Sequence, residues 1–193
     1  ERVLGDGPGR AYVLVVAAAA LWAGSEFTAG RQLRTTFLAI PRRLSVFVVK
    51  ASLLAFAVGI TAFLTMAGTI MITHAVGRTG VPWTLTPSIW GHVLGVTYAW
   101  ICTALIAFAA GCLTRSAIWP LVLVVPFAIG LGDFFATLWR GAAFLPVAAG
   151  AALYSDPSAD IHLSPLAGAG VLAAWTIVLV VISGIAFVKR DAP

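Results

Sequence analysis

The sequence predicts an all-α integral membrane protein, because its composition, its hydropathy and the lengths of its apolar runs all agree. Hydrophobic residues make up 61% of the 193 residues and charged residues only 10%, whereas soluble domains carry about 25% charged residues. The mean hydropathy is +1.01. Five apolar runs are near or above the roughly 20 residues that a helix needs to cross the hydrocarbon. We therefore expect one transmembrane domain over residues 1–193.

Five transmembrane helices are predicted in order along the chain. They cover residues 11–27, 46–75, 89–113, 117–138 and 166–188. The second is too long for a perpendicular span, so we expect it to tilt or to project into the cytoplasm before Ala51. A further apolar stretch, residues 142–153, has only 12 residues. That is too short to cross, and it predicts a re-entrant or interfacial helix before the last span.

Basic residues set the predicted orientation. Residues 26–50, between the first two spans, hold five of the twelve Lys and Arg residues, and loops rich in Lys and Arg stay in the cytoplasm. Alternation then places Arg115 and the tail at Lys189 inside as well. The chain is thus predicted to be a multi-pass protein of the plasma (inner) membrane with a cytoplasmic carboxyl terminus. The amino terminus falls outside with no signal peptide, so we expect one more span upstream and six in the complete subunit.

Several kinds of chemistry are not supported by the residues present. A P-loop needs Gly-Lys followed by Ser or Thr, but Lys50 and Lys189 both follow valine. We therefore expect no ATP hydrolysis by a P-loop of this chain, and no enzymatic activity. The three histidines lie in separate segments, which argues against a metal site. The basic residues lie at the ends of apolar runs, so the pI near 9.9 does not indicate a nucleic-acid partner.

The basic segment has the pattern of a short amphipathic helix. Gly30 and Pro41 bracket residues 31–40, enough for about three helical turns. The apolar positions at helical spacing are Leu33, Phe37 and Ile40, and the basic positions are Arg31 and Arg34. Two interpretations remain open: a helix lying on the inner leaflet with its arginines on lipid phosphates, or a helix that docks into a groove on a soluble partner.

Residues 25–51 resemble the ABC-2 type permease family. The resemblance rests on Glu26 at the inner end of a helix, the sequence Ala29-Gly30-Arg31, a short helix followed by Pro41-Arg42-Arg43, and Lys50 opening the next helix. The family usually has His-Gly-Thr where this chain has Ala29-Gly30-Arg31, so the match there is approximate.

That resemblance implies a coupling helix at residues 31–40 that rests on a separate ABC ATPase subunit. The ATPase would hold ATP and Mg²⁺, and this chain would hold no cofactor. A second permease subunit would complete a homo- or heterodimer in the bilayer. The residues expected to couple to the ATPase are Glu26, Arg31, Leu33, Arg34, Phe37, Ile40, Arg42, Arg43 and Lys50. The small residues Gly91 and Gly95, and Ala107 and Gly111, are spaced for close helix approach at a dimer seam.

Asp133 is the one carboxylate well within an apolar run, where an ionisable group is a functional candidate. Arg140 lies seven residues on, nearly on the same helical face, so the pair is either a structural interaction or part of a gate.

The expected function is an ATP-driven exporter of a hydrophobic or amphipathic substrate. The alternatives are a transporter or channel driven by an ion gradient through Asp133, and a membrane anchor that recruits a soluble partner. A neighbouring reading frame with a P-loop would favour the exporter.

Overall fold

Every regular element in the described part of this computed structural model is a helix. The described residues are 9–28, 43–75, 87–116, 118–126, 135, 139–154 and 163–189. The elements are α2 (Gly9–Thr28), α4 (Arg43–Ala75), α5 (Pro87–Thr114), α6 (Ile118–Pro126), η2 (Arg140–Phe144), α8 (Pro146–Ala151) and α9 (Pro165–Lys189). Helices α4, α5 and α9 are each long and apolar enough to cross a membrane, which confirms the all-helical, membrane-spanning character predicted from the composition.

Most predicted spans coincide with helices. The fourth span is described only in part, and residues 142–153 differ from the prediction. The spans at 46–75, 89–113 and 166–188 correspond to α4, α5 and α9, and the span at 11–27 lies within α2. The fourth span, 117–138, is described over α6 and at Phe135, and its remainder lies outside the described residues. The stretch at 142–153 contains two short helices where the sequence predicted one. Pro146 is the reason, because it holds Leu145 in an extended conformation (φ −69°, ψ 146°) and then starts α8.

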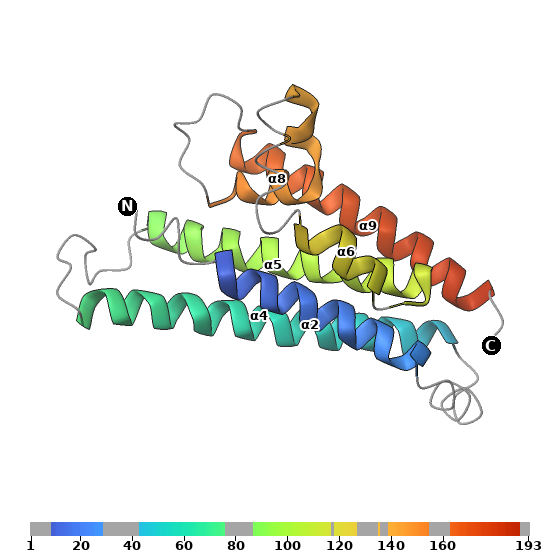
Figure 1. Cartoon of the computed structure of the whole chain (residues 1–193). Helices are drawn as coiled ribbons and strands as arrows, with labels where there is room; N and C mark the ends of the chain where they lie inside the picture. The colour runs from blue at the N-terminus through green and yellow to red at the C-terminus, as the bar shows by residue number, and fades with distance from the viewer. Residues whose placement is uncertain are drawn as a thin grey trace.

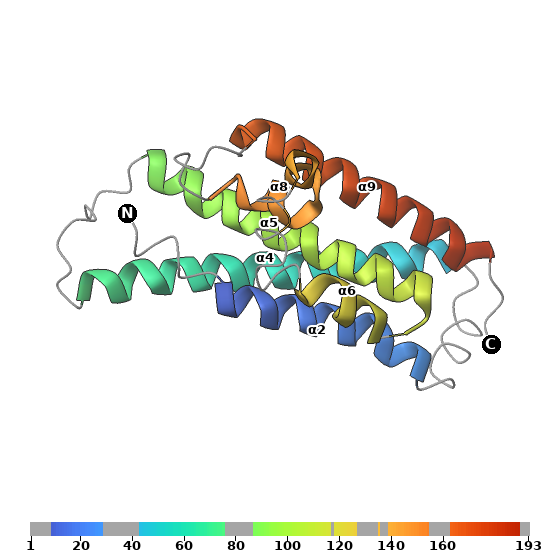
Figure 2. The same cartoon turned by 45° about the horizontal axis from the view of Figure 1, so that its top comes forward.

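Helix α5 forms the centre of the bundle (Figures 1 and 2). It packs against α2, α4, α6, α8 and α9. Its most apolar window is 61% buried, compared with 28% for α4 and 22% for α9. A fully apolar helix that is exposed on most of its surface needs a lipid environment, so α4 and α9 have the character of lipid-facing helices at the edge of the bundle.

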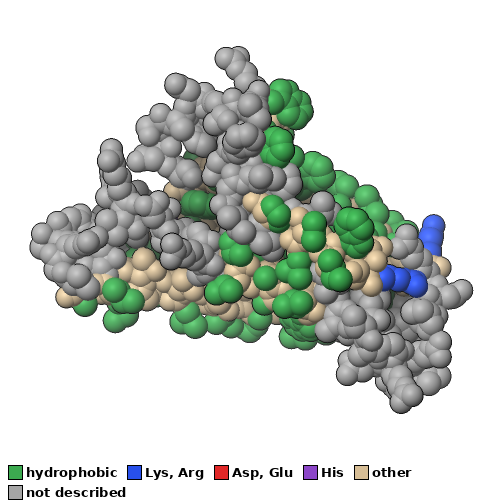
Figure 3. Space-filling view, in the orientation of Figure 1, with side chains coloured by type: hydrophobic (Ala, Val, Ile, Leu, Met, Phe, Trp, Pro, Cys, Tyr) green, Lys and Arg blue, Asp and Glu red, His purple; other side chains and the backbone are tan. Residues whose placement is uncertain are grey.

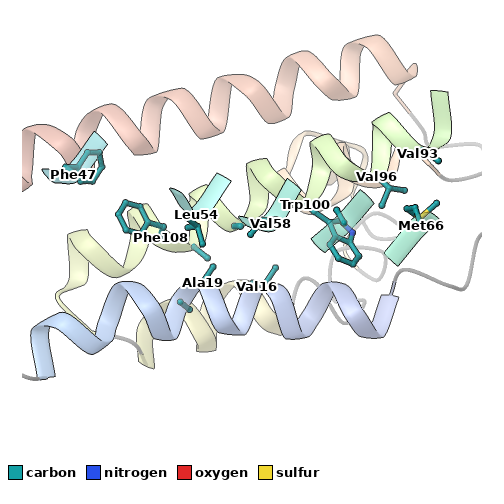
Figure 4. Close-up of a cluster of buried hydrophobic side chains, with 14 residues drawn as sticks. Val16, Ala19, Phe47, Leu54, Val58, Met66, Val93, Val96, Trp100 and Phe108 are labelled. Atoms are coloured by element: carbon teal, nitrogen blue, oxygen red, sulfur yellow. The ribbon is translucent and has the colours of Figure 1, made fainter. Parts of the chain in front are cut away.

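The core is a narrow seam of apolar side chains along α5 (Figure 4). Trp100 is only 1% exposed and is the largest fully buried side chain among the described residues. Val16 of α2 and Leu54 and Val58 of α4 belong to the same buried cluster. Trp100 therefore faces the bundle interior. Trp175 on α9 differs, since it is 41% exposed.

The helices alternate in direction and bring the basic ends together. Figure 1 shows the ends of α2, α5 and α9 on the same side as the start of α4. Helix α5 ends at Thr114, and Arg115 follows with a left-handed backbone (φ 51°), a common way to end a helix. Lys50, Arg115 and Lys189 all belong to this end by their positions in the helices. On the face drawn in Figure 3, the basic side chains lie at one end of an otherwise apolar described surface.

Two of the small residues predicted for a dimer seam, Gly95 and Ala107, are packed within the chain, whereas nothing lies within 4 Å of a methyl group built on Gly91. A methyl group on Gly95 would lie 2.8 Å from the Leu153 carbonyl oxygen, and Ala107 is fully buried in the core cluster. Gly168 of α9 is tighter still, with its hypothetical methyl 2.5 Å from the Ala149 carbonyl oxygen. These positions let two backbones approach closely within one subunit. Ala107 and Gly95 are therefore not available to a partner in this conformation.

We predict that Gly168→Ala destabilises the protein by about 1 to 3 kcal/mol, because the added methyl would overlap a backbone oxygen that cannot rotate away. The matched control is Gly170→Ala, two residues along the same helix, where nothing lies within 4 Å. Unfolding in detergent mixtures measures both variants. Equal stabilities would mean that α8 does not approach α9 as closely as described.

Candidate functional site

The most unusual part of the described fold is the segment from Trp139 to Tyr154, called here the 139–154 segment. It consists of η2, the extended residue Leu145, α8 and a turn. Pro146 lacks an N–H, so the change of direction at Leu145 leaves one fewer backbone donor to satisfy. The segment packs on α9 and on α5 (Figure 1). Its contacts with Gly168 and Gly95 fix it against the halves of these helices that lie away from the basic end.

A side-chain hydrogen bond fixes the tip of this segment. The Trp175 indole Nε1 donates to the Phe144 carbonyl oxygen at 2.9 Å, at the point where η2 ends. Trp175 lies ten residues after Pro165, about 15 Å along the helix axis. That is roughly half of the 30 Å hydrocarbon thickness. If α9 spans the membrane, the Phe144 carbonyl lies near its mid-depth; the re-entrant or interfacial placement of residues 142–153 remains a prediction.

Beside this segment, a small polar cluster joins α5 to α9. The Tyr98 hydroxyl donates to the Ala169 carbonyl oxygen at 3.2 Å. The Cys102 thiol lies beside the hydroxyls of Tyr98 and Thr176, and Thr176 Oγ1 donates to the Leu172 carbonyl at 2.8 Å. The cluster offers hydroxyl and thiol groups in apolar surroundings. It could hydrogen-bond an amphipathic molecule, but it contains no ionised group for acid or base catalysis.

Sequence reasoning missed this cluster. Cys102 and Cys112, ten residues apart on α5, are not joined by a disulfide. The available signal was the spacing of Tyr98 and Cys102, which are one helical turn apart and so share a face. Thr176 comes from a distant helix, and only the packing of α9 on α5 brings it close. No group of three potential metal ligands occurs among the residues that the structure describes.

The residues predicted to couple to an ATPase are mostly beyond the described ranges. Those outside are Arg31, Leu33, Arg34, Phe37, Ile40 and Arg42, as is Asp133. Glu26 lies in the last turn of α2, Arg43 begins α4 and Arg140 begins η2, each described only in its backbone. Lys50 is half-buried in α4. The coupling helix at 31–40 and the pair of Asp133 with Arg140 therefore remain predictions.

Comparison of the chain with protein-family models, with curated proteins and with solved structures gives no match in any of the three.

We predict that Trp175→Phe weakens the attachment of the 139–154 segment. Phenylalanine keeps an aromatic side chain but loses the N–H, so the Phe144 carbonyl loses its donor, and lipid around α9 would offer no replacement. The expected loss of stability is about 1 kcal/mol, with faster hydrogen exchange in residues 142–154. Trp90→Phe is the matched control, since Trp90 is also 41% exposed. The same effect in both variants would contradict a specific role for the Trp175 hydrogen bond.

Proposed function

We propose that this chain is the transmembrane permease subunit of an ATP-driven ABC exporter, working as a dimer with separate ATPase subunits. The observation that supports this proposal is the position of the basic segment between α2 and α4. The end of α2 and the start of α4 both open onto residues 29–42, where three of the twelve basic residues lie, and a fourth, Arg43, begins α4. The motif that resembles ABC-2 type permeases occupies this same stretch. A cytoplasmic ATPase that docks there would act directly on the starting end of α4.

The other described features fit this proposal. Lys50, Arg115 and Lys189 belong to the same end of the bundle, as expected if that end is cytoplasmic. The proposed location is the plasma (inner) membrane, with a cytoplasmic carboxyl terminus. The described side chains away from this end are apolar or uncharged, which favours a hydrophobic or amphipathic substrate over an ion. ATP and Mg²⁺ would bind to the partner subunit.

The docking step is tested through the predicted coupling helix. Phe37→Ala should weaken association with the proposed ABC ATPase subunit by about 2 kcal/mol, or roughly 30-fold in Kd, if Phe37 is an anchor in an ATPase groove. Binding of the purified ATPase to the permease in nanodiscs measures this. Phe56→Ala is the control, since Phe56 lies on α4 and is 69% exposed. Undiminished binding in the Phe37→Ala, Ile40→Ala double variant would leave only a lipid-surface role for residues 31–40.

A second test separates the exporter from a carrier driven by an ion gradient. Asp133→Asn keeps the side-chain shape and removes the charge, so an exporter should retain ATP-dependent transport in vesicles. The expected defect is a lower melting temperature, because Arg140 loses its partner. Transport that is lost in a variant with normal melting, and that stops in the parent when the proton gradient is collapsed while ATP remains, would identify Asp133 as the coupling site and rule out the exporter.

A further inference from the structure

Helix α9 has two attachments, one near each end of its set of buried residues. These residues are Gly168, Leu172, Thr176, Ser183 and Gly184. At about 100° per residue the first four fall within an arc of about 80°, and Gly184 lies about 100° further around the helix from Ser183. Gly168 meets the 139–154 segment, and Gly184 meets α4. The two glycines are 16 residues apart, or about 24 Å along a rigid helix. Most of the other large side chains of α9 are exposed, among them Leu166, Ile177 and Val181.

The attachment at Gly184 is made by Phe47. A methyl group on Gly184 would lie 3.3 Å from Phe47 Cε1, so little space remains between α9 and this ring. The ring centroid of Phe47 lies 5.5 Å from that of Phe108 on α5 and 5.6 Å from that of Phe187 on α9. Figure 4 shows Phe47 and Phe108 near one another. Phe47 thus joins the start of α4 to both neighbouring helices.

Phe47 is also the best-buried residue in the first turns of α4. It is 3% exposed, while Leu44, Val48 and Val49 are each more than half exposed. It lies four residues after Arg43, where α4 begins directly after the basic loop. Val46 beside it is also buried, at 8%, but the ring contacts to both α5 and α9 are those of Phe47. A displacement of that end of α4 therefore acts on α5 and α9 in part through the Phe47 ring. Ser183, next to Gly184, does not hold α9 in place by a hydrogen bond, since its buried Oγ has no partner.

The attachment of α9 to the 139–154 segment consists of a close backbone contact and a hydrogen bond. Gly168 packs on the Ala149 backbone, and the Trp175 indole binds the Phe144 carbonyl. Both contacts belong to α9 and both end on the 139–154 segment. A shift or tilt of α9 as a rigid body would change them together, because a well-packed helix moves as a unit more easily than it bends.

We infer that α9 links the start of α4 to the 139–154 segment. A displacement of the start of α4 would pass through the Phe47 ring to α9, and α9 would then shift the 139–154 segment. The inference rests on the proposed function in one respect, namely that an ATPase moves the loop before α4. The linkage itself is a property of the fold and is measurable without a partner.

The test is hydrogen exchange on the full chain in nanodiscs, without ATPase or substrate. Gly184→Ala should push α9 away from Phe47 and loosen the 139–154 segment. We expect exchange in residues 142–154 to rise by about 2-fold to 30-fold. The matched control is Gly170→Ala, on the same helix with nothing within 4 Å, and it should leave these amides unchanged. A rise confined to residues near Gly184, or an equal rise in the control, would overturn the linkage.

A suppressor separates transmission from simple loss of stability. Phe47→Leu removes the ring edge that the new methyl would meet, so the Phe47→Leu, Gly184→Ala double variant should return residues 142–154 to the exchange rate of the parent. Phe56→Leu is the control, because Phe56 lies on α4 and is 69% exposed; it should not suppress. Failure of Phe47→Leu to suppress would overturn the role of Phe47 even if Gly184→Ala has the expected effect.

A final arm distinguishes this inference from the proposed function. Adding the proposed ABC ATPase subunit together with ATP should change the hydrogen-exchange rate of residues 142–154 in the parent protein but not in the Phe47→Leu variant. If the ATPase does not bind the parent, the proposed function fails while the glycine and suppressor results still decide the linkage. If it binds and Phe47→Leu responds like the parent, the inference fails while the proposed function stands.

Discussion

Hydrogen bonding without water is the constraint on which the described structure depends. A helix in hydrocarbon satisfies its own backbone, but any interruption frees polar groups that lipid cannot satisfy. The interruption at Leu145 and Pro146 is such a place. Its cost is reduced because Pro146 has no N–H, and because the Trp175 indole donates to the Phe144 carbonyl. The 139–154 segment can therefore lie beside α9 without being a continuous helix.

The same constraint explains the hydroxyl groups inside the long helices. Most of these side chains donate to the carbonyl four residues earlier, which satisfies the hydroxyl within its own helix. The threonines that do so in α4, α5 and α9 are Thr61, Thr65, Thr69, Thr97, Thr103, Thr114 and Thr176. Tyr98 and Ser183 differ, because the Tyr98 hydroxyl reaches across to α9 and the buried Ser183 Oγ has no partner. Polar side chains thus stabilise the helices locally, and one of them also fixes how two helices pack.

Close approach of backbones supplies the remaining specificity. Apolar side chains gain little by leaving lipid for a protein interior, so helices in membranes associate through packing and small residues. Ala104, Ala107 and Ala109 of α5 are fully buried, which lets neighbouring helices come near its axis. Gly95 and Gly168 do the same for the 139–154 segment. At the basic end the contact is different, because the large Phe47 ring fills the space beside Gly184. The two ends of α9 are thus held by opposite means, a tight backbone contact at one end and an aromatic contact at the other.

The sequence by itself determined the class of protein, the position of the long helices and the end at which the basic residues gather. These follow from hydropathy and charge, which act on each segment separately, so α4, α5 and α9 could be predicted within a few residues. The coupling-site prediction likewise rests on a local pattern, residues 25–51. Tertiary structure decided the rest. That α5 is central, that Gly95 and Ala107 face their own chain, and that Trp175 meets Phe144 all depend on which helix lies beside which. Residues far apart in the sequence make these contacts, and uniformly apolar helices carry no amphipathic pattern to indicate which face turns inward.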